Sequence, residues 1–176
     1  MAKHALLPAT ILLLQIAAAA SSDGGVDAAC RKAPDARFCA SLLQPHASKL
    51  SDADDEETGM AAVNATFKRV DELRKFMVDE AVREQSTAEE MDALGDCLVN
   101  VGNGEGALEV ALHTLNEAGG GAERDEVPEM IGGAAEELSA CAESLKKHAH
   151  DYAIKKALDL TEDSVQACYV ARAILI

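Results

Sequence analysis

Residues 128–152, PEMIGGAAEELSACAESLKKHAHDY, carry the clearest pattern in the chain. Their apolar residues recur at steps of three and four, which places them in one stripe along a helix. The stripe consists of Ile131, Ala134, Leu138, Cys141, Leu145, His148 and Tyr152. An amphipathic helix of this kind needs partner helices to cover its apolar face, so the stretch predicts a bundle.

Three further segments show the same helical period. One follows the acidic run of residues 52–57, where the helix dipole favours negative charge, and the next follows overlapping capping boxes at Ser86 and Thr87. A third runs from about Asp151 to Leu175, and a fresh start at Thr161 is an open alternative there. Its predicted stripe consists of Ile154, Leu158, Val165, Cys168, Ala171 and Leu175. Because no alternating strand pattern occurs, we expect an all-α, up-and-down four-helix bundle.

Three glycines, Gly102, Gly104 and Gly106, interrupt the segment that begins near residue 88. Each costs about 1 kcal/mol relative to alanine inside a helix. The apolar repeat from Leu94 to Leu115 nevertheless keeps its phase across them, so we expect one weakened or kinked helix rather than two.

The first twenty residues are typical of a secretory signal. Lys3 gives a positive start, the run from Ala5 to Ala20 is uncharged, and small residues precede a cleavage point. We therefore expect a signal peptide at 1–20, an N-terminal hairpin region at 21–51 and a bundle at 52–176, with one functional domain over 26–176. No later segment is apolar for long enough to cross a bilayer, so we expect an exported chain with no membrane partner.

The formal net charge of −15 excludes several classes of partner. Such a chain repels nucleic acid and anionic lipid and favours a cationic partner. The chain has no Trp, two Tyr and three Phe, so it offers little surface on which bases could stack. The alternative explanation of the negative charge is that it only keeps the exported protein soluble.

The chain has five cysteines. Because an exported chain enters an oxidising compartment, we expect two disulfides and one free thiol. The residues alone do not choose among the pairings. Cys97 and Cys141 both lie on inward stripes of neighbouring helices, where a bridge could form, and Cys168 also faces inward. Asn64 opens the Asn64-Ala65-Thr66 sequon, a candidate N-glycosylation site in an exported chain.

The order of the cysteines and two short motifs stand out in the helix pattern. Cys30 and Cys39 come first in the chain, and Cys97 and Cys141 follow on the second and third bundle helices. Residues 93–97 read Ala-Leu-Gly-Asp-Cys, and residues 138–141 read Leu-Ser-Ala-Cys. Together these features resemble the plant invertase and pectin methylesterase inhibitor family, in which Ala-Leu-x-Asp-Cys and a related third-helix motif occur.

The resemblance implies disulfides Cys30–Cys39 and Cys97–Cys141, with Cys168 free. It implies a stand-alone inhibitor, since the chain ends at Ile176, secreted to the apoplast or cell wall. The partner would be a pectin methylesterase, or else a cell-wall or vacuolar acid invertase, bound one to one. A secreted helical relative without inhibitory activity is the other alternative.

Some residues depart from the family pattern. Ala140 stands where the family often has threonine before the third-helix cysteine, and Val101 stands where a tyrosine often follows the second-helix cysteine. The cluster of Gly102, Gly104 and Gly106 is also unusual. Invertase inhibitors can carry a Pro-Lys-Phe string, and its absence here favours pectin methylesterase as the target.

Enzyme chemistry finds little support in the sequence. His148, His150 and Asp151 could suggest a metal site, but residues at i and i+2 point to different sides of a helix and no third ligand has useful spacing. The chain also lacks a glycine-rich phosphate loop and a nucleophile elbow. We therefore expect no catalytic activity, no cofactor and no metal.

Overall fold

The computed structural model describes residues 23–51, 53–81, 87–117 and 122–176, and these are almost entirely helical. The long helices are α4 (Asp55–Ala81), α5 (Ala88–Glu117), α6 (Val127–Lys146) and α7 (Tyr152–Leu175). The shorter elements are α1 (Asp23–Cys30), α2 (Ala36–Leu43), the 3-10 turn η1 (Gln44–His46), α3 (Ala47–Leu50) and the 3-10 turn η2 (Ala122–Glu126). No strand occurs within the described ranges, which confirms the prediction of an all-α fold.

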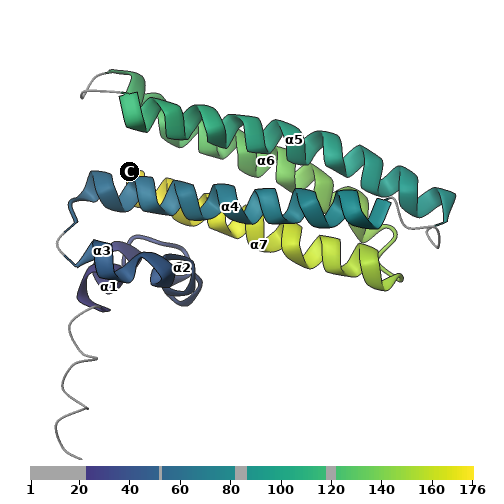
Figure 1. Cartoon of the computed structure of the whole chain (residues 1–176), viewed down its shortest axis with the longest axis horizontal. Helices are drawn as coiled ribbons and strands as arrows, with labels where there is room; N and C mark the ends of the chain where they lie inside the picture. Colours follow the sequence, from purple (N-terminus) through teal and green to yellow (C-terminus); the bar gives the residue numbers. More distant parts are fainter. Residues whose placement is uncertain (1–22, 52, 82–86, 118–121) are drawn as a thin grey trace, which may run out of the picture.

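The long helices lie side by side, and successive ones run in opposite directions (Figure 1). Helices α4 and α6 each pack against both α5 and α7, which closes the four into one bundle. Leucine, isoleucine, valine and methionine side chains fill the interior. The largest of these fully buried side chains include Val63, Val70, Leu73, Met77, Leu94, Val101, Leu108, Ile131, Leu138, Leu145 and Ile154.

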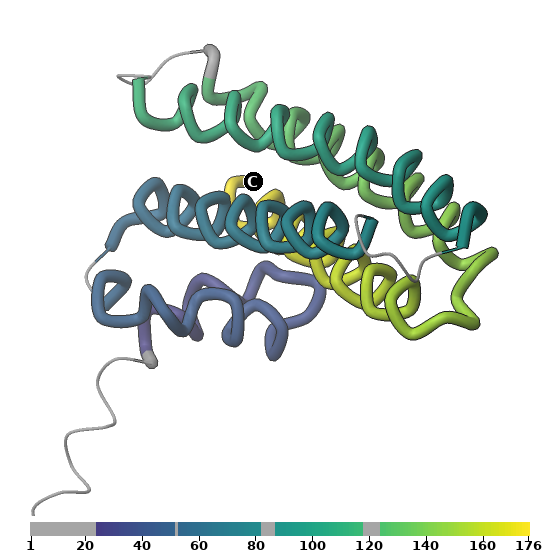
Figure 2. The backbone as a smooth tube through the Cα atoms, turned by 45° about the vertical axis from the view of Figure 1, so that its right-hand side comes forward, coloured from purple at the N-terminus to yellow at the C-terminus, as the bar shows by residue number. Residues whose placement is uncertain are grey.

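The N-terminal hairpin, residues 23–51, packs on α4 and α7, on the side of the bundle away from α5 and α6 (Figures 1 and 2). Two contacts fasten it there. The Arg69 guanidinium of α4 lies 5.1 Å from the centre of the Phe38 ring, and the Gln166 amide of α7 donates to Asp35 at 3.2 Å. Inside the hairpin, α1 comes so close to α3 that a Cβ on Gly25 would overlap the Leu50 carbonyl.

Helix α5 is continuous through the three glycines, as the phase of its apolar repeat predicts. Thr87 and Glu90 form the predicted capping box: the Thr87 amide donates to the Glu90 carboxylate at 2.6 Å, and the Glu90 amide donates to the Thr87 hydroxyl at 3.2 Å. Ser86, the other predicted cap, lies outside the described residues. Gly104 faces α6, where a Cβ would sit 3.4 Å from the Ala134 carbonyl oxygen, so its small size permits close helix packing.

The prediction that one helix runs as far as Tyr152 is wrong. Helix α6 ends at Lys146, and residues 147–150 form a turn. Asp151 then caps a new helix, because its carboxylate accepts hydrogen bonds from the amides of Ala153 and Ile154. Tyr152 is 82% exposed and His148 is only half-buried, so neither extends the apolar stripe. The periodicity continued past Lys146 by coincidence, and the local capping bond decided the boundary.

The predicted face of α7 is partly wrong as well. Leu158, Val165 and Leu175 are half-buried, whereas small residues occupy the centre of the interface. The buried small side chains are Ala157, Thr161, Ser164, Ala167 and Ala171. Small residues suit α7 because it contacts α4 and α6 and also the hairpin, and close backbones leave little room. Thr161 starts no new helix: its hydroxyl donates to the Ala157 carbonyl within one continuous helix.

Candidate interaction surface

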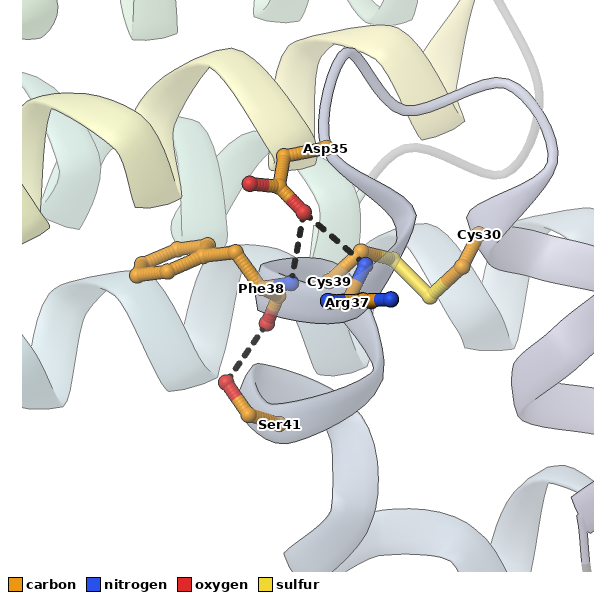
Figure 3. Close-up of a disulfide and its surroundings, with 6 residues drawn as sticks. All are labelled: Cys30, Asp35, Arg37, Phe38, Cys39 and Ser41. Carbon is orange, nitrogen blue, oxygen red and sulfur yellow. Dashed lines mark hydrogen bonds between the residues drawn. A yellow bond between two sulfur atoms is a disulfide. The ribbon is translucent and has the colours of Figure 1, made fainter.

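The structure joins Cys30 to Cys39 within the hairpin, with Cα atoms 5.5 Å apart (Figure 3), and Cys97 to Cys141 between α5 and α6, with Cα atoms 4.5 Å apart. These are the pairs that the family resemblance implies. Cys168 is a buried free cysteine on α7. Burial raises the pKa of its thiol to about 12, so the group stays protonated and is a poor nucleophile. The cysteines therefore staple the fold and offer no reactive centre.

Asp35 orders the segment beside the hairpin disulfide (Figure 3). One of its carboxylate oxygens accepts hydrogen bonds from the amides of Arg37 and Phe38, both at 2.9 Å, which starts α2. The bond from the Phe38 amide is the main reason that the pKa of this carboxyl lies below its usual value. Because the other oxygen accepts from Gln166, the same carboxylate also links the hairpin to α7.

The charges are divided unevenly between the two halves of the bundle. Helices α5 and α6 together carry eleven carboxylates and one basic side chain, Lys146. Helices α4 and α7 carry ten carboxylates and seven basic side chains. Since the hairpin lies on α4 and α7, the acidic pair presents its outer face to solvent. This face, which we call the acidic α5–α6 face, is suited to a cationic protein surface.

An uncharged strip runs along α5 within the acidic face. Its members recur at steps of three and four and lie opposite the buried residues of α5: they are Met91, Gly95, Val99, Gly102, Gly106 and Val110. Val99 is 64% exposed and Val110 is 53% exposed. A Cβ added at Gly95, Gly102 or Gly106 would meet no atom within 4 Å, so packing inside the protein does not require these glycines. The strip combines little side-chain bulk with exposed apolar groups, flanked by the carboxylates of Asp92, Asp96 and Glu109.

The two substitutions that depart from the family pattern lie in different environments. Ala140 is exposed on α6, so the alanine alters the surface and leaves the core unchanged. Val101 is fully buried between the helices, where it belongs to the main apolar core. The one departure that lies in the core thus keeps an apolar side chain there.

The remaining candidate residues lie apart from the acidic face. Asn64 is exposed on α4, and His148 and His150 lie in the turn between α6 and α7. Within the described residues no three histidine, cysteine or carboxylate side chains form a group that could hold a metal ion. None of the described helices combines the length and the apolar character that a bilayer crossing requires. The proposed signal at 1–20 lies outside the described residues.

Sequence reasoning missed the concentration of acidic charge on one half of the bundle. The signal was present, because residues 88–117 contain no lysine or arginine. The exposed strip could also have been found by reading the period of the glycines and valines on α5. Which half is left uncovered could not, because that depends on where the hairpin packs.

Comparison with known proteins gives one match. The family model described as plant invertase/pectin methylesterase inhibitor matches residues 25–174, which take in the hairpin and the four long helices almost completely. No curated protein and no solved structure matches the chain. The matched span contains both disulfides and the acidic α5–α6 face.

Proposed function

Since the chain belongs to the plant invertase/pectin methylesterase inhibitor family, we propose that it is a secreted, non-catalytic inhibitor of a pectin methylesterase. It binds the enzyme one to one in the cell wall, after removal of a signal peptide at residues 1–20. The inhibitor domain spans residues 26–176. Bound to the enzyme, the protein acts by occlusion, and its contribution is shape and charge rather than chemistry.

The observation that carries the proposal is the acidic α5–α6 face. The two helices that form it carry eleven carboxylates and one lysine, which favours a basic enzyme surface, and the face offers exposed apolar area at Val99 and Val110. Long-range attraction between opposite charges accelerates association, and the apolar centre excludes water once the proteins meet. Bound to this face, the enzyme lies away from the hairpin.

The test is a titration of the mature protein against a basic pectin methylesterase and, separately, an acid invertase. We expect inhibition of the methylesterase to saturate at one equivalent and the invertase to keep its activity. Inhibition of the invertase alone would transfer the proposal to that enzyme class. Activity of both enzymes in excess protein would leave a secreted helical relative that does not inhibit.

The placement of the interface is tested with two matched variants. One removes three exposed carboxylates of α5, Asp92→Asn, Asp96→Asn and Glu109→Gln. The control removes three exposed carboxylates of the other half, Glu72→Gln, Asp79→Asn and Asp159→Asn. We expect the α5 variant alone to inhibit more weakly; equal weakening in both would mean that total charge, and not this face, guides the complex.

A further inference from the structure

A groove between α3 and α4 lies on the hairpin side of the molecule, beyond the acidic α5–α6 face. It has a volume of about 410 Å³ and is lined by His46, Lys49, Leu50, Glu57, Met60, Ala61, Asn64 and Lys68. Nothing in the proposed contact with an enzyme uses these residues. The lining includes three basic side chains, one amide and one carboxylate, although the net charge of the chain is −15.

The lysines of the groove are not neutralised within the described part of the protein. On α4 itself, Arg69 pairs with Asp163, Arg74 with Glu105 and Lys75 with Asp71. Lys68 and Lys49 form no such pair with any described carboxylate, although carboxylates outnumber basic groups about two to one. Both lysines instead act on His46: its partial burial and the nearby charges of Lys68 and Lys49 lower the pKa of the imidazole. The cations therefore converge on one place.

The lining combines these charges with an apolar floor. Leu50 is buried, Met60 and Ala61 are half-buried, and the Asn64 amide stands at the exposed side of the same groove. A small inorganic anion would use the lysines alone. A sugar acid would use the whole lining, because it carries a carboxylate, hydroxyl groups and an apolar face of C–H bonds.

We propose that the α3–α4 groove binds a carboxylated polysaccharide, in the form of unesterified uronate residues. The choice of a uronate rests in part on the proposed function, because a pectin methylesterase leaves free carboxylates where it hydrolyses methyl esters. The groove then holds the inhibitor on the acidic polymer while the opposite face of the bundle binds the enzyme. Attachment to polymer and contact with protein thus use separate surfaces.

The direct test is a titration of mature protein, followed by amide chemical shifts at physiological salt. The protein is produced in a host that does not glycosylate, so that Asn64 carries no glycan over the groove. We expect a galacturonate oligomer to shift amides of residues 46–50 and 57–68, and its fully methyl-esterified form to shift none of them. Equal shifts with inorganic sulfate, or no shifts with the oligomer, would overturn the proposal.

A paired variant identifies the residues responsible. Replacing both groove lysines, Lys49→Gln and Lys68→Gln, should weaken oligomer binding roughly tenfold or more, since two attractive charges are lost at short range. The matched control is Lys155→Gln with Lys156→Gln, two exposed lysines at the start of α7 outside the groove. Equal loss in both variants would mean that binding is non-specific attraction. Unchanged binding in the groove variant would also overturn the proposal.

Acidity gives a second readout that involves His46. The charged groups facing it are Lys49 from α3 and Glu57 and Lys68 from α4. A bound carboxylate favours the protonated imidazole, so affinity should rise by about fivefold from about pH 7 to about pH 5. The variant His46→Gln should remove this rise and still bind the oligomer. A rise of the same size in His46→Gln would exclude this histidine.

The experiment separates this proposal from the proposed function. The Lys49→Gln, Lys68→Gln variant should inhibit the methylesterase as well as the natural sequence does, because the groove lies away from the acidic face. If the natural protein inhibits the methylesterase but does not bind the oligomer, only the proposed polysaccharide site in the groove is contradicted. If the natural protein binds the oligomer but does not inhibit the methylesterase, only the proposed enzyme target is contradicted.

Discussion

The two halves of the bundle are built from similar helices but are stabilised and covered in different ways. Helices α4 and α7 carry the hairpin, have nearly balanced charge and are joined by the ion pair Arg69–Asp163 and by the Thr66 hydroxyl, which donates to the Ala167 carbonyl at 3.1 Å. Helices α5 and α6 have no such cover and concentrate like charge. Their covalent link, Cys97–Cys141, holds together two helices whose carboxylates repel each other. Contact with the hairpin and polar contacts between helices stabilise the α4–α7 half, and a disulfide stabilises the α5–α6 half, whose outer face is free to bind a partner.

The largest effect should come from removing that link. Loss of Cys97–Cys141, which spans a sequence separation of 44, should cost about 4 kcal/mol on the loop-entropy model, against about 3 kcal/mol for Cys30–Cys39, with a separation of 9. We therefore expect the double variant Cys97→Ser, Cys141→Ser to have a lower melting temperature than the double variant Cys30→Ser, Cys39→Ser. The difference should widen at low salt, where repulsion between α5 and α6 is least screened. Equal melting temperatures would contradict this division between the halves.

The second effect concerns the rate at which the acidic face meets its enzyme. Removing the carboxylates of Asp92, Asp96 and Glu109 should slow association roughly tenfold at low salt, because steering by opposite charges is lost. The natural sequence should itself associate more slowly as salt rises, while its dissociation changes less. Surface binding kinetics at several salt concentrations measure both rates. An association rate independent of salt would show that shape and apolar contact, not charge, bring the partners together.

A third effect distinguishes the glycines of α5 from one another. Gly102→Ala and Gly106→Ala should each stabilise the protein by up to about 1 kcal/mol, because the added methyl meets open space and alanine favours helix. Gly104→Ala should gain less, since its methyl would lie not in open space but at the tight limit of van der Waals contact, 3.4 Å from the Ala134 carbonyl oxygen of α6. Thermal unfolding gives the stabilities. If the exposed strip contacts the enzyme, the two stabilised variants should also inhibit less well, whereas unchanged inhibition would place the contact elsewhere.

The smallest effect should be confined to the hairpin. Asp35→Ala removes the bonds that start α2 and the link to Gln166, so hydrogen exchange should quicken in residues 36–43 and little elsewhere. The folded protein holds the pKa of Asp35 below its ordinary value, so its contribution is present above that value and is lost as pH falls through the lower folded pKa. The hairpin should therefore loosen at acidities where α5 and α6 keep their protection. Asp151→Ala, which removes the cap of α7 instead, is the matched control.

The helical period was enough to predict the fold class and the buried faces of α5, from Leu94 to Leu115, and of α6, from Ile131 to Leu145. It failed where a local polar contact outweighed it: Asp151 caps a new helix, and Tyr152, which continues the apolar period in the sequence, is exposed. It also failed in part on α7, where a helix enclosed on several sides buries small residues at positions outside the predicted stripe and leaves Leu158, Val165 and Leu175 only half-buried. The candidate surface needed the structure, because charge counts on each helix gain meaning only when the position of the hairpin shows which half is uncovered.

Gly25 is a position at which the hairpin tolerates few substitutions. Its neighbour Gly24 has open space around the position of a side chain, whereas any side chain at Gly25 would push α1 away from the Leu50 carbonyl. In a saturation library these two adjacent glycines should therefore behave as opposites, one permissive and one nearly invariant. The displacement would be felt beside the α3–α4 groove, since Leu50 lines it. A single backbone contact thus couples the mutational freedom of the first helix to the shape of a surface formed by later parts of the chain.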